Sequence, residues 1–269
     1  MPKHIVILII LFFTIQYCYC QQKKEVFHLS LSVKKIANSL YNTLYFIDAR
    51  SDTAMGLVQV GAFNRVARVV ATVPFSEQLN NVMHSLIDTT AQNGKLLFQL
   101  RELTFSEITN AFSEYGFCHL RAKLYVVLNG VYQPLNLIDT LIVVKSFDVT
   151  NGILKKGASA INNFIAENLT QIPVDTTQHS FADVKNVDNI EKLAIPVYNT
   201  ATYKDGLYKT YTAFKNQLPD ESIQVEMKSN RVASVQIIYT NGKTQHVKPQ
   251  FIYAIVYNGQ PYIVNSNYG

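Results

Sequence analysis

Carboxylates are the side chains whose types and spacing come closest to a catalytic chemistry. Glu102, Glu107 and Glu114 lie in one short segment, and Asp139 follows further along the chain. Two carboxyl groups hydrolyse glycosidic bonds when they flank the bond across a cleft. Spacing alone does not place two of them face to face, and charged side chains usually lie on the surface. A hydrolase acting on glycan or peptidoglycan is therefore one hypothesis for this chain.

No other motif with a mechanistic spacing is present. The sequence has no histidine pair at helical spacing for zinc, no Cys-x-x-Cys, no glycine-rich phosphate loop and no Gly-x-Ser-x-Gly. The run Asn241-Gly242-Lys243-Thr244 lacks the upstream glycine of a phosphate loop, and a hairpin turn explains it better. Beyond the first twenty residues the histidines are widely separated: His28, His84, His119, His179 and His246. We therefore expect no metal, no cofactor and no catalytic centre.

The first twenty residues have the pattern of an export signal. A short polar start is followed by residues 5–15, which are apolar apart from Thr14. Cys18-Tyr19-Cys20 then forms a small-x-small cleavage site ahead of Gln21. This pattern predicts a signal peptide over residues 1–20, a mature chain that begins at Gln21, and a periplasmic or extracellular location.

This segment also has two other interpretations. A membrane anchor needs about 20 apolar residues, more than this run contains, so we expect no transmembrane span after cleavage. A lipoprotein signal would make Cys18 or Cys20 the lipid-bearing residue, but bulky Tyr17 and Tyr19 stand where small residues are usual. A lipid-anchored form is therefore disfavoured, and peripheral membrane contact stays open.

The composition of the chain excludes further functional classes. The chain has 24 basic and 19 acidic residues, and the signal contains one of the basic ones, so the mature net charge is +4. The basic residues are scattered, whereas nucleic-acid binders concentrate them on one face, so we expect no nucleic-acid partner. Cleavage leaves Cys118 as the one cysteine of the mature chain, which excludes an intramolecular disulfide and predicts a small buried side chain.

The first half of the mature chain alternates strands with two amphipathic helices. Strands are predicted at residues 44–48, 56–60 and 96–101, and the apolar spacing predicts helices over 75–92 and 152–169. Residues 119–128 alternate apolar and polar side chains, and Asn129-Gly130 supplies a two-residue type I′ turn. The returning strand then places Leu135 and Leu137 on the core face with Leu128. These elements predict a mixed sheet with two packed helices.

The hydrophobic periodicity of the chain is lost after residue 170. Residues 171–189 lack periodicity, which predicts a linker between a domain at 21–170 and a second domain at 190–269. The second domain has one short helix at 210–217 and strands that form an antiparallel meander. The overall fold class is therefore α+β: an N-terminal mixed sheet with two packed helices, followed by a small β-meander domain.

Tyrosines are concentrated in the second domain. They either form an aromatic surface that stacks on sugar rings or anchors a partner, or they fill the core of a thin sheet that has no tryptophan. The candidate contact residues are Tyr203, Tyr208, Tyr253, Tyr257 and Tyr262.

Two resemblances are present. The patterns Tyr203-Lys204-Asp205-Gly206-Leu207-Tyr208 and Tyr253-Ala254-Ile255-Val256-Tyr257-Asn258-Gly259, closed by Tyr262-Ile263, resemble a module of uncharacterised exported proteins of Gram-negative bacteria, for which no catalytic residues are implied. The element order of residues 44–169 is similar to that of auxiliary envelope lipoproteins that accompany ABC-type transporters. The disfavoured lipidation signal departs from that second family.

These observations favour an exported accessory or interaction protein of the bacterial cell envelope that is not an enzyme. Its partner would be another envelope protein or a second copy, contacted through exposed sheet edges. The alternatives are the hydrolase, which needs two carboxyls in a groove, and a small-ligand carrier, which needs a closed apolar cavity between helix and sheet.

Overall fold

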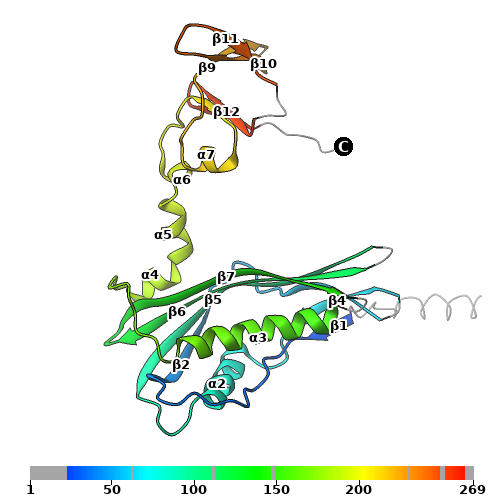
Figure 1. Cartoon of the computed structure of the whole chain (residues 1–269), viewed down its shortest axis with the longest axis vertical. Coiled ribbons are helices and arrows are strands. Elements are labelled where there is room, and N and C mark those ends of the chain that lie inside the picture. Colours follow the sequence, from blue (N-terminus) through cyan, green and yellow to red (C-terminus); the bar gives the residue numbers. More distant parts are fainter. Residues whose placement is uncertain are drawn as a thin grey trace, which may run out of the picture. The chain divides into compact units, whose positions relative to one another are not determined.

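The computed structural model describes residues 23–61, 63–110, 113–146, 149–229, 231–248 and 252–263 (Figure 1). The chain divides into two compact units, Met1–Val184 and Lys185–Gly269. The signal peptide predicted at 1–20 lies outside the described residues. Within the described ranges, no helix combines the length and the apolar character that a membrane crossing requires.

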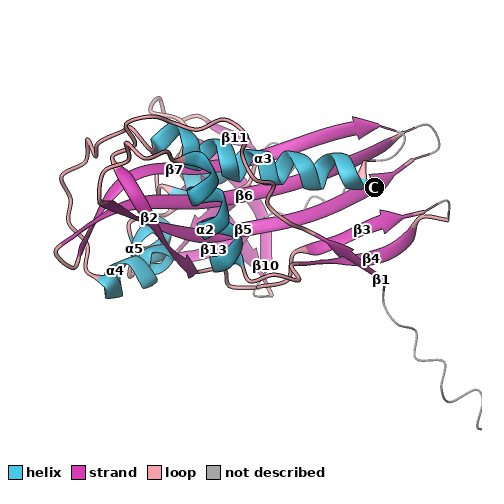
Figure 2. Cartoon of the chain, turned by 90° about the horizontal axis from the view of Figure 1, so that it is seen from below, coloured by secondary structure: helices cyan, strands magenta, loops and turns pink. Residues whose placement is uncertain are grey.

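The first unit is built on one seven-stranded mixed sheet (Figures 1 and 2). Its strands are β1 (Lys23–Val26), β2 (Tyr41–Asp48), β3 (Gly56–Val60), β4 (Arg65–Val70), β5 (Gly94–Thr109), β6 (Glu114–Leu128) and β7 (Val131–Ser146). The spatial order is β1-β4-β3-β5-β6-β7, and β2 pairs with β5 beside this path. The pairs β1–β4, β2–β5 and β3–β5 are parallel, while β3–β4, β5–β6 and β6–β7 are antiparallel. The mixed sheet predicted from the sequence is confirmed.

Two helices cover one face of this sheet, as Figure 2 shows. Helix α3 (Thr150–Asn168) buries its predicted apolar stripe against the core. Helix α2 (Phe75–Leu86) ends earlier than the predicted residue 92. The reason is local: the Asp88 carboxylate accepts hydrogen bonds from the backbone amide and hydroxyl of Thr90, and this turn competes with a further helical turn. Ile87 is then extended and bridges to Ile36.

Close packing of α3 on the sheet depends on two glycines. A Cβ atom at Gly157 would lie 2.9 Å from Cε1 of Phe105 and 3.0 Å from Sγ of Cys118. On the sheet, a Cβ at Gly116 would lie 3.0 Å from Cβ of Ile153. Phe105 and Cys118 are fully buried, so their atoms have no free space to move into. Glycine at these two positions therefore lets the helix backbone approach β5 and β6.

Cys118 is a structural thiol. It is 0 % exposed, and burial raises the pKa of its thiol to about 12. The reactive thiolate is therefore scarce at neutral pH, in agreement with the small buried side chain expected from the sequence.

We expect Cys118 to react with a thiol reagent such as DTNB only as fast as the first unit opens. Modification should be absent on the timescale of minutes in buffer and complete in denaturing urea. A Cys118→Ala/Ser106→Cys variant is the control, because Ser106 is exposed on the adjacent strand and its cysteine should react at an ordinary rate. Equal rates for the two proteins in buffer would contradict the packing described above.

The β6–β7 hairpin is confirmed, with one correction. Asn129 and Gly130 have positive φ angles of 49° and 82°, and Val131 pairs with Leu128 as predicted. A β-bulge then shifts the register, since Tyr125 pairs with Pro134 but Leu124 pairs with Asn136. Because of the extra residue, the side chains after the bulge point to the opposite face of the sheet from the one predicted. Leu137, which was expected on the core face, is therefore 47 % exposed on the opposite, outer face.

The segment expected as a linker, 171–189, contains defined structure. It includes α4 (Phe181–Lys185) and the first part of α5 (Val187–Leu193). His179 exchanges two backbone hydrogen bonds of 2.9 Å with Tyr132 on β7. Val184 is buried with Leu97 and Tyr125 on the outer face of the sheet. Residues up to Val184 therefore pack as part of the first unit.

The second unit contains two three-stranded antiparallel sheets in place of one continuous meander. The first sheet is β9 (Ile223–Lys228), β10 (Arg231–Ile238) and β11 (Thr244–His246); the second is β8 (Gly206–Tyr208), β12 (Ala254–Tyr257) and β13 (Gln260–Ile263). The remaining helices are α6 (Pro196–Asn199) and α7 (Tyr211–Lys215). Leu207, Val235 and Ile255 form an apolar cluster that joins the two sheets. The α+β class is confirmed.

The tyrosine-rich pattern has a structural role in the second sheet. The Asp205 carboxylate accepts hydrogen bonds from the backbone amides of Asn258 (3.0 Å) and Gly259 (2.8 Å). It thereby fixes the turn between β12 and β13, whose residues are far away in the sequence. Tyr208 is fully buried and donates its hydroxyl to the Lys204 carbonyl at 2.6 Å. The residues that carry the resemblance therefore hold β8, β12 and β13 together.

Candidate interaction site

Strand β7 forms an edge of the large sheet, and its second half is open. Its inner side pairs with β6 from Val131 to Ser146. On its outer side, Tyr132 bonds to His179, and the Leu137 amide donates to the side chain of Asn136 at 2.8 Å. Within the described residues, no backbone hydrogen bond reaches the outer side beyond Leu137. The second half of β7 is therefore an unpaired edge.

The phase of the antiparallel ladder identifies the residues that face this edge. In an antiparallel strand, successive residues alternate between bonding one neighbour and facing the other side. The Leu137 amide does not bond β6, so every second residue after it also directs its N–H and C=O outward. The edge-facing residues are Asp139, Leu141, Val143 and Lys145.

The same residues present their side chains on the outer face, which α2 and α3 do not cover. Leu141 is 60 % and Val143 52 % exposed. The residues between them, such as Ile138, Ile142 and Val144, pack against the core on the helix side. The open edge is therefore bordered by apolar side chains that a paired strand could cover.

A row of charges crosses the outer face and ends at this edge. Glu102 on β5 lies opposite Arg121 on β6, which lies opposite Asp139 on β7. Asp139 accepts a hydrogen bond from Nε2 of His119 at 3.1 Å and pairs with Nε of Arg121 at 3.4 Å. The charges alternate from strand to strand, and the last one, on the edge, is negative.

The candidate carboxylates of a hydrolase do not converge as a group of four. Glu102 and Asp139 share the outer face, but Arg121 lies between them. Glu107 accepts a hydrogen bond from the backbone amide of Gln59 at 2.7 Å, and Glu114 begins β6 beside the β5–β6 turn. This arrangement does not favour the acid and base pair of a glycosidase, which must flank a substrate bond.

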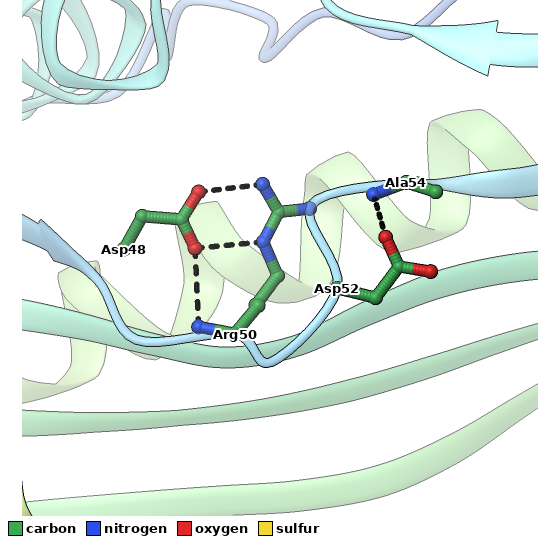
Figure 3. A network of polar contacts seen from close by, with 4 residues as sticks. All are labelled: Asp48, Arg50, Asp52 and Ala54. Atoms are coloured by element: carbon green, nitrogen blue, oxygen red, sulfur yellow. Dashed lines mark hydrogen bonds and ion pairs between the residues drawn. The ribbon is translucent and has the colours of Figure 1, made fainter.

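A buried arginine closes the loop after β2 (Figure 3). The Arg50 side chain is 6 % exposed, and its Nε and Nη2 donate to the two carboxylate oxygens of Asp48 at 2.8 and 2.6 Å. Asp52 accepts one hydrogen bond from the Ala54 amide. Burial of Asp48 disfavours its charge, but the hydrogen bonds and the charge of Arg50 outweigh this effect and lower its pKa. The pair is a structural clamp on the loop.

Replacing Asp48 by alanine is expected to destabilise the first unit by about 2 kcal/mol, because it leaves the Arg50 guanidinium buried without its counter-charge. Asp52→Ala, which removes one exposed hydrogen bond, should cost less than about 0.5 kcal/mol. The measurement is urea unfolding at pH 7. The lowered pKa adds a pH dependence: stability from Asp48 is present above its unfolded pKa, near about 3.9, and is lost as pH falls through the lower folded value. The two variants would show equal stability at pH 7 if the clamp were unimportant.

The five candidate tyrosines have different environments. Tyr208 is in the core, and Tyr203 and Tyr253 are partly buried against Phe214 in the same cluster. Tyr257 and Tyr262 are half-buried at the β12–β13 hairpin. Core packing therefore accounts for Tyr208, while an aromatic contact surface stays a prediction for the others.

An exposed aromatic group that includes Tyr198 was not anticipated from the sequence. Tyr198 and Tyr211 are 48 % and 50 % exposed, and the Tyr211 ring lies edge-on to Tyr253 at 5.6 Å. The charge of the neighbouring Tyr198 and then burial raise the pKa of Tyr211. Lys192 lies 4.8 Å over the Tyr198 ring. These residues come from α5, α6, α7 and the segment before β12, so their meeting depends on the tertiary fold.

The second unit also contains an apolar cavity of about 430 Å³. It lies between the two small sheets and is lined by Val232, Val235, Val247, Ile252, Ile255 and Tyr262, among others. The cavity of a ligand carrier was expected between a helix and a sheet, and this one lies between two sheets.

Comparisons with known proteins leave the family open. No family model and no curated protein matches the chain. Among solved structures, the chain is similar to the crystal structure of a DUF330 protein from Xanthomonas campestris, with 10 % identity and a TM-score of 0.34. The match covers 62 % of this chain and 99 % of that protein.

Proposed function

We propose that this chain is an exported, non-enzymatic interaction protein of the bacterial cell envelope that engages its partner by strand addition to β7. The single observation that carries the proposal is the unpaired edge formed by Asp139, Leu141, Val143 and Lys145. Strand addition gives affinity through main-chain hydrogen bonds and specificity through alternate side chains.

The two halves of β7 differ in a way that supports this function. Proteins usually protect sheet edges with prolines, bulges or covering segments, because open edges recruit other chains. The first half of β7 has all three: Pro134, the bulge beside it, and the strand bridge from His179. Within the part of the chain that the structure describes, residues 139–145 have none of these, and they place exposed Leu141 and Val143 beside the free backbone groups. The features that protect the β7 edge from other chains therefore end before residue 139, where the exposed apolar part of the edge begins.

Site-specific photo-crosslinking tests the proposal. A photoreactive amino acid at Leu141 in the full-length chain, expressed with its signal in a Gram-negative host, should give discrete crosslinked bands in the envelope fraction. The same residue at Leu57 is the matched control, because Leu57 is 48 % exposed in the same sheet but lies on β3, which pairs on both sides. Equal crosslinking at both positions, or none at Leu141, would contradict an edge-specific interaction.

A ligand carrier is the second candidate, and the cavity of about 430 Å³ in the second unit favours it. Binding of an apolar fluorescent probe should then be abolished by Val235→Trp, which fills the cavity, and retained by Val66→Trp on the exposed surface of β4. Probe binding that is the same in both variants would reject this candidate.

A further inference from the structure

The open half of β7 places chemical requirements on the strand that pairs with it. Such a strand must present four outward N–H and C=O pairs to Asp139, Leu141, Val143 and Lys145. It must also place a cation opposite Asp139, an anion opposite Lys145, and apolar side chains opposite Leu141 and Val143, because directly opposed pairs determine how well two strands fit.

We propose that the occupant of this edge is β7 of a second copy of the chain, paired antiparallel about a two-fold axis at Ile142. This inference rests on the proposed function and names its partner. In this register Asp139 lies opposite Lys145 of the second copy, and Leu141 lies opposite its Val143. Each pairing occurs twice by symmetry. The four edge-facing residues of each copy thus form hydrogen-bonded pairs, with about eight hydrogen bonds between the strands.

Charge complementarity selects this register. Moving the register by one residue pair toward the hairpin turn places Asp139 opposite Val143 and Lys145 opposite Leu137, which removes both charge pairs. Moving it the other way places Lys145 opposite Leu141. A parallel pairing in register would bring Asp139 against Asp139 and Lys145 against Lys145, so like charges would repel.

The proposed pairing also extends the charge row on the outer face. Within one copy, the row alternates Glu102, Arg121, Asp139 and stops at the edge with a carboxylate. The second copy adds Lys145, so the alternation continues across the interface. In its own copy, Lys145 lies 5.2 Å over the ring of Tyr115 and is exposed, which leaves its ammonium accessible from the edge.

Charge reversal with mixing is the test, performed on the mature chain 21–269 by analytical ultracentrifugation. The parent should self-associate to a dimer. Asp139→Lys alone places a new lysine side chain against Lys145 of the other copy, and Lys145→Glu alone places a new glutamate against Asp139. Because like charges then oppose each other, each variant should associate at least about tenfold more weakly.

Mixing the two variants restores an opposite-charge pair at both ends of the paired strands. In the register about Ile142, the Asp139→Lys copy presents two cations and the Lys145→Glu copy presents two anions, so every cross-pair is favourable. The mixture should therefore form dimers. Lys24→Glu, on the opposite edge strand β1, is the matched control and should associate like the parent.

Recovery of dimers in the mixture also shows that each variant is folded. A parent that stays monomeric at about 100 µM, or a mixture that associates no better than its components, would overturn the inference. The crosslinking experiment separates this failure from that of the proposed function. A monomeric parent with a Leu141 crosslink to a different envelope protein rejects the second copy and keeps strand addition. A monomeric parent with no Leu141 crosslink rejects both.

Discussion

Replacing Val143 by proline is expected to weaken binding at the β7 edge by at least about tenfold while leaving the first unit folded. Proline has no amide hydrogen, and its ring occupies the space that a paired strand needs. The Val143 amide faces the open edge, so the β6–β7 ladder keeps its hydrogen bonds. Pro134 already occupies such an outward position in the same strand. Sedimentation and crosslinking yield measure the loss, and thermal unfolding verifies the fold.

Val143→Thr is the matched control for this variant. Threonine keeps the β-branched shape and the backbone amide, so edge pairing should persist with only a small loss from the added hydroxyl. A similar loss of binding in both variants would mean that the Val143 side chain, and not its backbone, makes the contact. Unchanged association in the proline variant would place the interface elsewhere.

Replacing Gly157 by leucine is expected to destabilise the first unit by about 3 kcal/mol. Even a single Cβ at this position would lie within 3.0 Å of the buried Phe105 ring and the Cys118 thiol. A leucine would therefore push α3 away from β5 and β6 and disrupt the main core. Urea unfolding followed by far-UV circular dichroism measures the change.

The alanine variants of Gly157 and Gly152 should change the stability of the first unit in opposite directions. Both positions lie in α3, where alanine favours helix over glycine by up to about 1 kcal/mol. A Cβ at Gly152 would lie at an ordinary 3.4 Å from Val144, so Gly152→Ala should stabilise the unit. Gly157→Ala should destabilise it, because the close contacts outweigh the gain in propensity. Stabilisation by both would show that α3 packs less closely than described.

Elements whose conformation depends mainly on one local sequence signal were predicted correctly. Asn129-Gly130 determines the hairpin turn, and the spacing from Ile153 to Leu169 determines the buried face of α3. Predictions failed where a side chain competes with the regular pattern. Asp88 ends α2 early through its bonds to Thr90, and the bulge near Pro134 reverses the facing of Leu137. Neither effect appears in hydrophobic periodicity.

The candidate site was harder to predict, because an edge is a property of strand order. The pattern of residues 137–145 resembles that of any strand with one apolar face, and it does not reveal which strand has no neighbour. Pro134 is the one signal that could have indicated it, since proline within a strand pattern favours an edge position. The alternating row of Glu102, Arg121 and Asp139 depends on the pairing of three strands.

Amide hydrogen exchange along β7 tests the central claim most directly. At concentrations where the protein is monomeric, the amides of Leu141 and Val143 should exchange rapidly, while those of Thr140 and Ile142, which bond β6, should be protected. At concentrations where it associates, or when its partner is added, protection should appear at Leu141 and Val143 in the same alternating pattern. Association that leaves these two amides in rapid exchange would contradict strand addition at β7.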